Sequence, residues 1–199
     1  MRKLLWIFQI MVLVAVWPLQ LRAEPQTAQD VVATTTDQVL KTLRDQAGGT
    51  DPQTALGAID HLVMPHVDLP KMSQRLLGEQ WTAATTEQKD RFSGELRKLL
   101  VKTYAAVFQQ YANAKVAYLP GKSDPSKSIA VVKSQVTNES GSPVSIDYQL
   151  RQQNGEWKLI DVAVGGVSLV ANYRASFGKM ISSMGIDGLT TALSAHNQS

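Results

Sequence analysis

The pattern of hydrophobic and polar positions divides the chain into two parts with different periods. In the first part apolar residues recur every three to four positions, the spacing of amphipathic helices. This spacing predicts helical segments over residues 27–46, 52–65 and 70–77, which glycines and prolines separate. The longest segment runs from Thr86 to about Tyr111 and has a broad apolar face. We expect it to form the spine of the domain.

In the second part the period changes to two, which predicts strands. Residues 116–119 form a short strand that Pro120-Gly121 is expected to end, and residues 128–136 form another. Apolar and polar side chains alternate strictly over residues 144–150, which is typical of a half-buried strand. Asn154-Gly155 then indicates a tight hairpin.

A helical pattern returns after a last predicted strand over residues 157–164. Gly165-Gly166 ends that strand, Ser168 stands where a helix cap is needed, and Gly185 is expected to end the new helix before a last short one. Helices, then an antiparallel meander, then a closing helix indicate an α+β fold in one domain, with helices packed on one face of a curved sheet.

The first 23 residues have the layout of a secretory signal peptide. Arg2 and Lys3 precede the apolar stretch 4–17, and a short polar segment ends at Ala23. The stretch is shorter than the roughly 20 residues that a membrane-spanning helix needs. We expect cleavage after Ala23, leaving a single domain of residues 24–199 in the periplasm; an uncleaved membrane anchor is the alternative.

The leader also accounts for the net charge. The chain has 20 Lys and Arg against 17 Asp and Glu and a pI near 9.1, which by itself favours nucleic acid or an anionic membrane as a partner. Three of the basic residues and none of the acidic ones lie in residues 1–23, so the mature chain carries 17 of each. We therefore expect no nucleic-acid binding. The lack of cysteine excludes a disulfide scaffold and thiolate chemistry.

Few side chains are candidates for catalysis. His61 and His66 flank Pro65 and cannot share a helix face as a zinc pair would. Asp161 has apolar neighbours on its predicted strand, where a structural hydrogen bond is favoured over a role as general base. Ser168 lacks the G-x-S-x-G frame of a nucleophile and fits better as a helix cap. We predict no catalytic residue, no metal and no cofactor.

An ordered set of short motifs resembles a known family. The set covers nearly the whole mature chain and consists of Leu76-Leu77-Gly78-Glu79-Gln80-Trp81, Ala84-Thr85-Thr86-Glu87-Gln88, Arg91-Phe92, Leu99-Leu100-Val101-Lys102-Thr103-Tyr104, Asp147-Tyr148-Gln149-Leu150, residues 155–162, Gly166-Val167-Ser168-Leu169, residues 172–177 and residues 185–189. In this order the motifs are similar to those of the MlaC family, also called the toluene-tolerance auxiliary family, of periplasmic phospholipid-binding proteins.

The resemblance implies a nuclear-transport-factor-2-like fold with an apolar cavity between sheet and helices. It also implies a non-catalytic carrier of the Mla pathway, which maintains lipid asymmetry of the Gram-negative outer membrane. Such a carrier exchanges phospholipid between an outer-membrane complex of MlaA with a porin and an inner-membrane ABC transporter, through its MlaD subunit. We expect a monomer with phospholipid as cargo. An enzyme of the same cone-shaped fold and a periplasmic adaptor without ligand remain alternatives.

The candidate lipid-binding residues follow from the strand faces and from the helices opposite. The inward set of one strand is expected to be Val144, Ile146, Tyr148 and Leu150. Trp157 or Ile160, depending on register, and Val162 would extend it. The other side is expected to be closed by Leu76, Trp81, Leu100, Tyr104, Val167 and Leu169. For each of these residues, ordinary core packing is an equally good interpretation.

Overall fold

The computed structural model describes residues 26–45, 51–123, 128–138 and 141–199. The expected leader and its cleavage site lie outside these residues. Six helices, together with short π and 3-10 turns, accompany five strands in the described ranges. The helices are α1 (Ala28–Asp45), α2 (Pro52–Ala58), α3 (Leu69–Leu77), α4 (Glu79–Ala83), α5 (Thr86–Gln110) and α6 (Leu169–Gln198). The π turn Ile59–Val63 and the 3-10 turn Met64–His66 continue α2 toward α3.

The predicted helix starts are confirmed by their caps. The Thr85 hydroxyl accepts from the Gln88 amide, and the Gln88 side chain accepts from the Thr85 amide, which completes the capping box of α5. The Ser168 hydroxyl accepts from the Ala171 amide at the start of α6. At Gly185, φ is 70° and ψ is −177°, a conformation that essentially only glycine adopts. The chain therefore turns back there, as the sequence predicted.

The five strands form one antiparallel sheet in the order β1-β2-β3-β4-β5. They are β1 (Lys115–Ser123), β2 (Ile129–Thr137), β3 (Val144–Gln153), β4 (Glu156–Val164) and β5 (Val167–Ser168). Asn154 and Gly155 both have positive φ and join β3 to β4 in the predicted hairpin. The α+β fold with an antiparallel sheet is thus confirmed.

One strand prediction is wrong. Pro120-Gly121 does not end β1, which continues to Ser123 after a register shift between Leu119 and Lys122. Because β1 is an edge strand, a proline without an N–H group is tolerated at such an irregularity.

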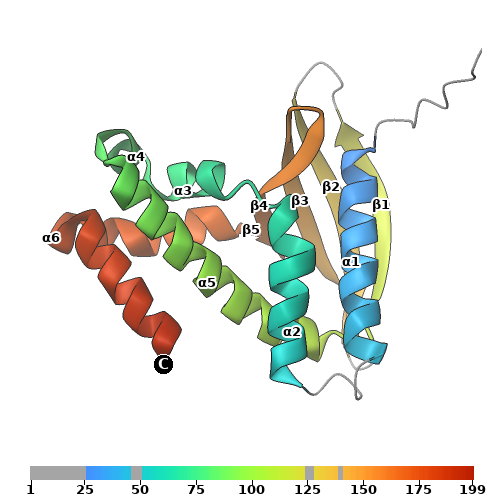
Figure 1. The fold of residues 1–199 in the computed structure, drawn as a ribbon. Helices are drawn as coiled ribbons and strands as arrows, with labels where there is room; N and C mark the ends of the chain where they lie inside the picture. Colours follow the sequence, from blue (N-terminus) through green and yellow to red (C-terminus); the bar gives the residue numbers. More distant parts are fainter. Residues whose placement is uncertain (1–25, 46–50, 124–127, 139–140) are drawn as a thin grey trace, which may run out of the picture.

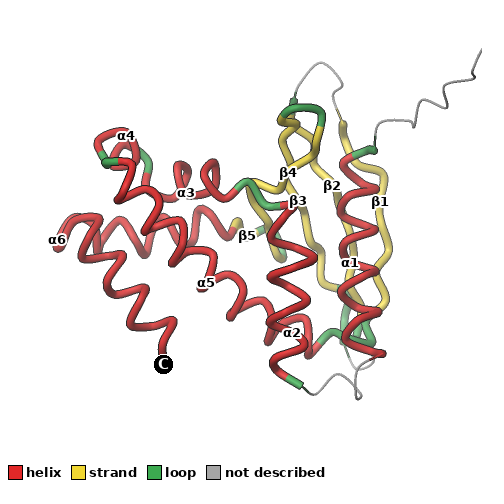
Figure 2. The backbone as a smooth tube through the Cα atoms, viewed as in Figure 1, coloured by secondary structure: helices red, strands yellow, loops and turns green. Residues whose placement is uncertain are grey.

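The helices are arranged as two groups around the sheet (Figure 1). Helices α1 and α2 run side by side in front of the sheet, while α3, α4, α5 and α6 gather to the left of it (Figures 1 and 2). The buried residues that α3, α5 and α6 contribute to the second group form what we call the helical core: Met72, Leu76, Leu77, Phe92, Leu96, Leu99, Leu100, Val170, Phe177, Leu189 and Leu193. In the part of the chain that the structure describes, no helix is both long enough and apolar enough to span a membrane.

Candidate functional site

An apolar pocket lies between the sheet and both groups of helices. Its volume is about 200 Å³. An engineered apolar cavity of about 150 Å³ in another protein stays free of water and binds benzene. A pocket of this size and lining therefore favours an apolar ligand over water.

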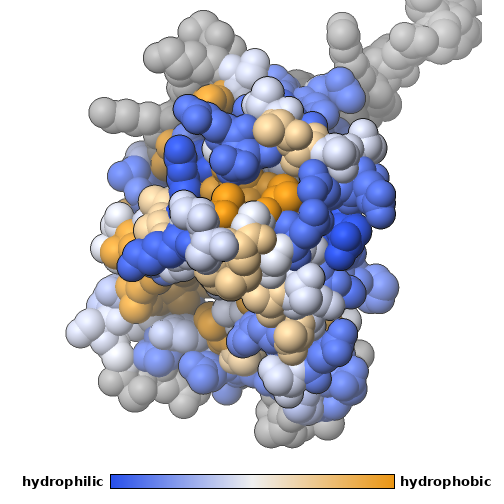
Figure 3. All heavy atoms as spheres, turned by 90° about the vertical axis from the view of Figure 1, so that its left-hand side faces the viewer, coloured by the Kyte–Doolittle hydropathy of each residue, from blue (hydrophilic) through white to orange (hydrophobic). Residues whose placement is uncertain are grey.

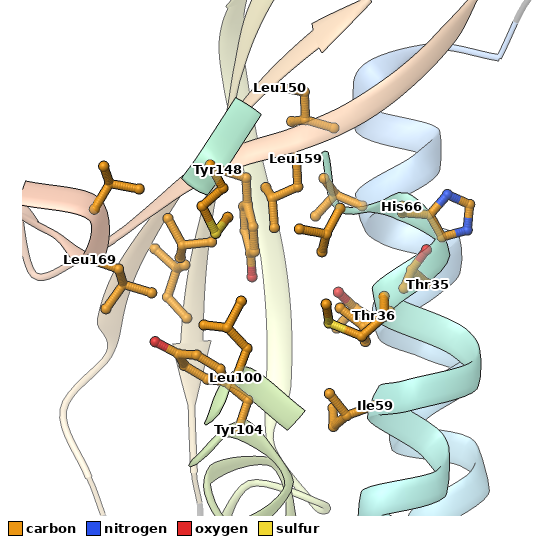
Figure 4. Close-up of a pocket in the computed structure, with 18 of the residues that line it drawn as sticks. Thr35, Thr36, Ile59, His66, Leu100, Tyr104, Tyr148, Leu150, Leu159 and Leu169 are labelled. Atoms are coloured by element: carbon orange, nitrogen blue, oxygen red, sulfur yellow. The ribbon is translucent and has the colours of Figure 1, made fainter. Parts of the chain in front are cut away.

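Six elements and the turns after α2 supply the wall of the pocket, and most of the side chains are aliphatic. In Figure 4, Leu150 and Leu159 project from the sheet above the pocket, Leu100 and Tyr104 lie below it, and Ile59 and Thr36 lie on the side of α1 and α2. The remaining wall residues are Val31, Val32, Thr35, Val63, Met64, His66, Val67, Met72, Leu76, Leu96, Val107, Phe108, Ile146, Tyr148, Val162, Val164, Leu169, Val170 and Tyr173.

Eight of the thirteen candidate residues line this pocket. They are Leu76, Leu100, Tyr104, Ile146, Tyr148, Leu150, Val162 and Leu169. The alternation of β3 explains three of them, because Ile146, Tyr148 and Leu150 share one face of the strand.

The other five candidates lie outside the wall. Trp81 packs on the helical core from α4, with the Lys89 ammonium 5.5 Å from its ring centre. Val144 is the first residue of β3, and Val167 is 62% exposed on β5. Trp157 packs with α1 and the neighbouring strands, on residues that form a separate apolar cluster.

Ile160 is displaced from the wall by a register shift. Gln149 pairs with Asp161 and Leu150 pairs with Leu159, so Ile160 is the extra residue of a bulge in β4. Leu159 therefore takes the wall position for which the sequence offered Trp157 or Ile160. Neither the spacing of apolar residues nor a turn motif marks this bulge in the sequence.

Several of the wall residues that the sequence did not nominate lie on predicted apolar stripes. Val32 of α1, Ile59 and Val63 of the second helical segment and Val107 and Phe108 of the spine helix are examples. Periodicity identified these residues as facing inward. It could not distinguish a side chain that fills a core from one that borders a space.

Burial favours the neutral forms of three titratable groups in the wall. Burial raises the pKa of Tyr148 to about 12 and also raises the pKa of Tyr104. Burial, reinforced by the charge of Lys158, lowers the pKa of His66. Because all three shifts oppose a charge, the wall is uncharged at neutral pH, as an apolar ligand requires.

A set of polar residues joins α3 and the start of α6 to β3 and β4, on the side of the strands that does not line the pocket. We call Asp68, Arg75, Gln149, Arg151 and Asp161 the polar joint. Arg75 donates to the Gln149 side-chain oxygen at 2.9 Å and lies 3.6 Å from the Asp161 carboxylate. Arg151 pairs with Asp68, which is 6% exposed and caps α3 by accepting from the Lys71 amide.

Asp161 is the buried carboxylate that the sequence singled out, and its partners agree with a structural role. It accepts from the Ser168 hydroxyl at 2.6 Å, from the Val162 amide at 2.8 Å and from the Val170 amide at 3.2 Å. These bonds fasten the start of α6 to β4. Asp161 does not belong to the pocket wall, because it alternates with Val162 and faces the other side of β4.

The edge of the pocket reaches the surface beside β4 and α5. Two wall residues, Val107 and Val164, are 42% and 39% exposed. Figure 3 shows the face formed by the helical group, where apolar side chains gather in the middle and beside a hollow, with hydrophilic residues around them. Exposed apolar atoms next to an apolar pocket are typical of a ligand entrance.

Solved and curated proteins resemble this chain over most of its length. A structure of the phospholipid-binding protein from Ralstonia solanacearum, in complex with a phospholipid, matches with a TM-score of 0.79 and 31% identity, covering 86% of this chain and 97% of that one. The toluene tolerance protein ttg2D of Pseudomonas putida is 29% identical over 181 residues, which are 89% of this chain and 83% of that protein.

A second curated relative and a family model point the same way. The intermembrane phospholipid transport system binding protein MlaC of Haemophilus influenzae is 23% identical over 146 residues, or 72% of this chain and 68% of that protein. The family model described as MlaC protein matches residues 33–195. This chain therefore belongs to the MlaC family, as the ordered motifs of its sequence predicted.

Proposed function

We propose that this protein is a non-catalytic phospholipid carrier that holds acyl chains in the pocket between the sheet and the helices. The observation that carries the proposal is the uncharged, largely aliphatic wall of the pocket, in a chain similar to a solved protein in complex with a phospholipid. The eight wall residues that the sequence nominated, among them Ile146 and Leu150, are proposed to contact the acyl chains.

The physical reason for a carrier is the cost of exposing acyl chains to water. Each methylene kept out of water is worth about 0.8 kcal/mol, so a long chain is worth on the order of 12 kcal/mol. A free phospholipid therefore crosses an aqueous compartment slowly, and a protein that covers the chains removes most of this barrier. Release then requires a docking event that opens the pocket or competes for the chains.

We further propose that the chain works as a monomer in the periplasm after removal of residues 1–23. It would exchange phospholipid between the outer-membrane complex of MlaA with a porin and the inner-membrane ABC transporter, through MlaD. The balanced charge of residues 24–199 means that docking depends on local patches. The mass of the protein recovered from the periplasm tests the leader, because cleavage after Ala23 makes Glu24 the first residue.

Lipid extraction and native mass spectrometry of the purified protein test the proposal directly. We expect copurified phospholipid in the wild type and its loss in Ile146→Glu, because a charge in the pocket wall is costly to bury. Ile129→Glu is the matched control, since Ile129 is 44% exposed on β2. We expect this variant to keep its bound lipid.

The outcomes separate the three functional classes. Copurified phospholipid that is exchanged intact with vesicles supports the carrier. A wild-type protein without lipid, which also takes none from vesicles, would support an adaptor. Release of lysophospholipid or fatty acid from the vesicles would support an enzyme.

A further inference from the structure

A row of apolar side chains leads from the pocket to the surface across three strands. Ile146 of β3 pairs with Val164 of β4, and Val164 pairs with Val167 of β5. Register partners in an antiparallel pair place their side chains on the same face of the sheet. Ile146 and Val164 line the pocket, so Val167 continues the same face beyond the wall. We call these three residues the apolar row.

The exposed fraction of the side chains increases along the apolar row. Ile146 is half-buried, Val164 is 39% exposed and Val167 is 62% exposed. The row ends at β5, the last strand of the sheet, and the next residue but one, Leu169, returns to the wall. Figure 4 shows Leu169 on the side of the pocket opposite Thr36. Val167 therefore lies at the outer rim of the pocket.

The turn that joins Val164 to Val167 leaves both valines uncovered and holds them in place. Gly165 and Gly166 have φ of 57° and 83°, as in a two-residue hairpin turn, and bring no side chain to the tip. Within the described ranges, a Cβ atom added to either glycine would meet no atom within 4 Å. The Gly165 amide donates to the Ser145 carbonyl at 2.9 Å, which fixes the turn against β3.

Exposed apolar side chains are concentrated at this rim. Three of the six large apolar residues that are exposed in the described part of the chain are Val107, Val164 and Val167. Val107 of α5 and Val164 line the pocket, and Val167 is the register partner of Val164. Single exposed apolar side chains are common and need no explanation, but a group of them beside an apolar pocket is typical of a binding function.

The apolar row gives an acyl chain apolar neighbours outside the wall. A chain that left the pocket straight into water would expose its methylenes one after another, and each would raise the barrier. Side chains at the rim cover part of that surface during the passage. Val167 lines no part of the pocket, so it contacts a passing chain and not a fully seated one. An interaction made only in the transition state changes the rates of loading and release by the same factor and leaves the affinity unchanged.

We propose that acyl chains enter and leave the pocket along the apolar row, and that Val167 sets the rate of lipid exchange without contributing to lipid affinity. The inference rests on the proposed function, because it assumes that acyl chains occupy the pocket. It gives a role to Val167, which the sequence nominated for the wall and the structure places outside it.

Loading and release are measured separately with vesicles of dipalmitoyl phosphatidylglycerol. Lipid-free mature protein is mixed with the vesicles for loading, and protein loaded with the deuterated lipid is mixed with excess unlabelled vesicles for release. The protein is re-isolated at intervals, and its bound lipid is quantified by native mass spectrometry. Val167→Thr keeps the branched shape of the side chain and replaces one methyl group by a hydroxyl. We expect both rates to fall by about fourfold, the equivalent of one methylene, with the Kd unchanged.

Three further variants test the position and the chemistry of the effect. Ile129→Thr makes a similar change at a residue that is 44% exposed on β2 and lines no part of the pocket, and it should leave both rates unchanged. Val167→Ile keeps the apolar surface and should retain the wild-type rates. Val164→Thr should slow exchange and also weaken binding, because Val164 belongs to the wall as well as to the rim.

The possible results have distinct meanings. Unchanged rates in a Val167→Thr protein that folds and loads lipid would overturn the entry path and leave the carrier intact. Equal slowing in Ile129→Thr would also overturn it, because the effect would not depend on position. A weaker affinity with an unchanged loading rate in Val167→Thr would place Val167 in contact with seated lipid and overturn its kinetic role. A wild-type protein that loads no phospholipid would contradict the carrier itself, and the entry path with it.

Discussion

The helical core and the pocket use similar side chains and even share Leu96 and Leu100, but only the core is filled. In the core, Phe92 meets Phe177 edge-on with ring centres 6.1 Å apart, and Phe92 is fully buried. In the pocket, side chains from six elements face one another across about 200 Å³ of space. Apolar composition alone therefore does not decide whether a region closes into a core.

The helical core and the pocket differ in the interactions that hold their helices and strands together. In the helical core, apolar side chains of α3, α5 and α6 hold the helices together directly. Around the pocket, α3 and the start of α6 are fastened to β3 and β4 through the polar joint, whose residues alternate with wall residues along the strands. Gln149 and Arg151 belong to the joint while Tyr148 and Leu150 line the pocket. The joint supplies attachment that the unfilled space cannot supply.

The largest expected effect comes from the same truncation in both regions. Leu189 is fully buried in the helical core, and Leu159 is a half-buried wall residue. Truncation of a buried leucine to alanine lowers the free energy of unfolding by roughly 2–5 kcal/mol. We expect a loss near the upper end of this range for Leu189→Ala. We expect a loss near the lower end for Leu159→Ala, because fewer neighbours surround the Leu159 side chain. Urea denaturation of both variants measures the difference. Equal losses would mean that the pocket wall is packed as tightly as the core.

Removal of bound lipid should affect only the pocket region. If phospholipid occupies the pocket, saturation at about a hundred times the Kd stabilises the folded state by about 2.7 kcal/mol. Hydrogen exchange of loaded and lipid-free protein measures where this stabilisation acts. We expect faster exchange without lipid in the strands that line the pocket, such as residues 146–150, and less change in residues 186–193 of the helical core. An equal increase in the exchange rate in the pocket strands and in the helical core would argue against two separate regions.

Disruption of the polar joint should lower the free energy of unfolding by less than Leu189→Ala does, but by more than loss of an exposed ion pair does. Arg75→Met leaves the Gln149 side chain and the buried Asp161 without their cationic partner. Hydrogen bonds to charged groups are worth about 1.5–3 kcal/mol, and we expect a loss in that range. The control is Lys133→Met, which removes an exposed pair with Asp147 and should cost about 1 kcal/mol or less. Similar losses for the two variants would show that the joint is no stronger than the surface pair.

Much of the fold could be predicted from the sequence because the residues that begin and end each helix and strand lie close together in the chain. The capping box at Thr85, the cap at Ser168 and the break at Gly185 each depend on residues close together in the chain. The inward face of β3 follows from its alternation. These signals specify each element by itself, and the helices and strands formed largely where they were predicted.

The polar joint and the bulge of β4 could not be predicted, because both depend on elements far apart in the sequence. Gln149 and Arg151 form the polar set of an alternating strand, which is also typical of a solvent-facing side. Their partners Arg75 and Asp68 lie more than seventy residues away. Ile160 looks like a wall residue until pairing with β3 shows that it is the extra residue. The unfilled space itself has no signature in the sequence.

The smallest expected effect is a pH dependence that arises at the pocket wall and not in the helical core. Burial and the charge of Lys158 lower the pKa of His66 below its ordinary value of 6.5, and Glu156 opposes this weakly. The unfolded chain therefore binds a proton at higher pH than the folded one, so His66 contributes stability above about pH 6.5 that is lost as the pH falls through its lowered pKa. Thermal unfolding between pH 7 and pH 5 measures this loss. We expect His66→Gln to reduce the fall in Tm over this range and His61→Gln, at an exposed position, to retain it. An identical fall in both variants would place the titrating group elsewhere.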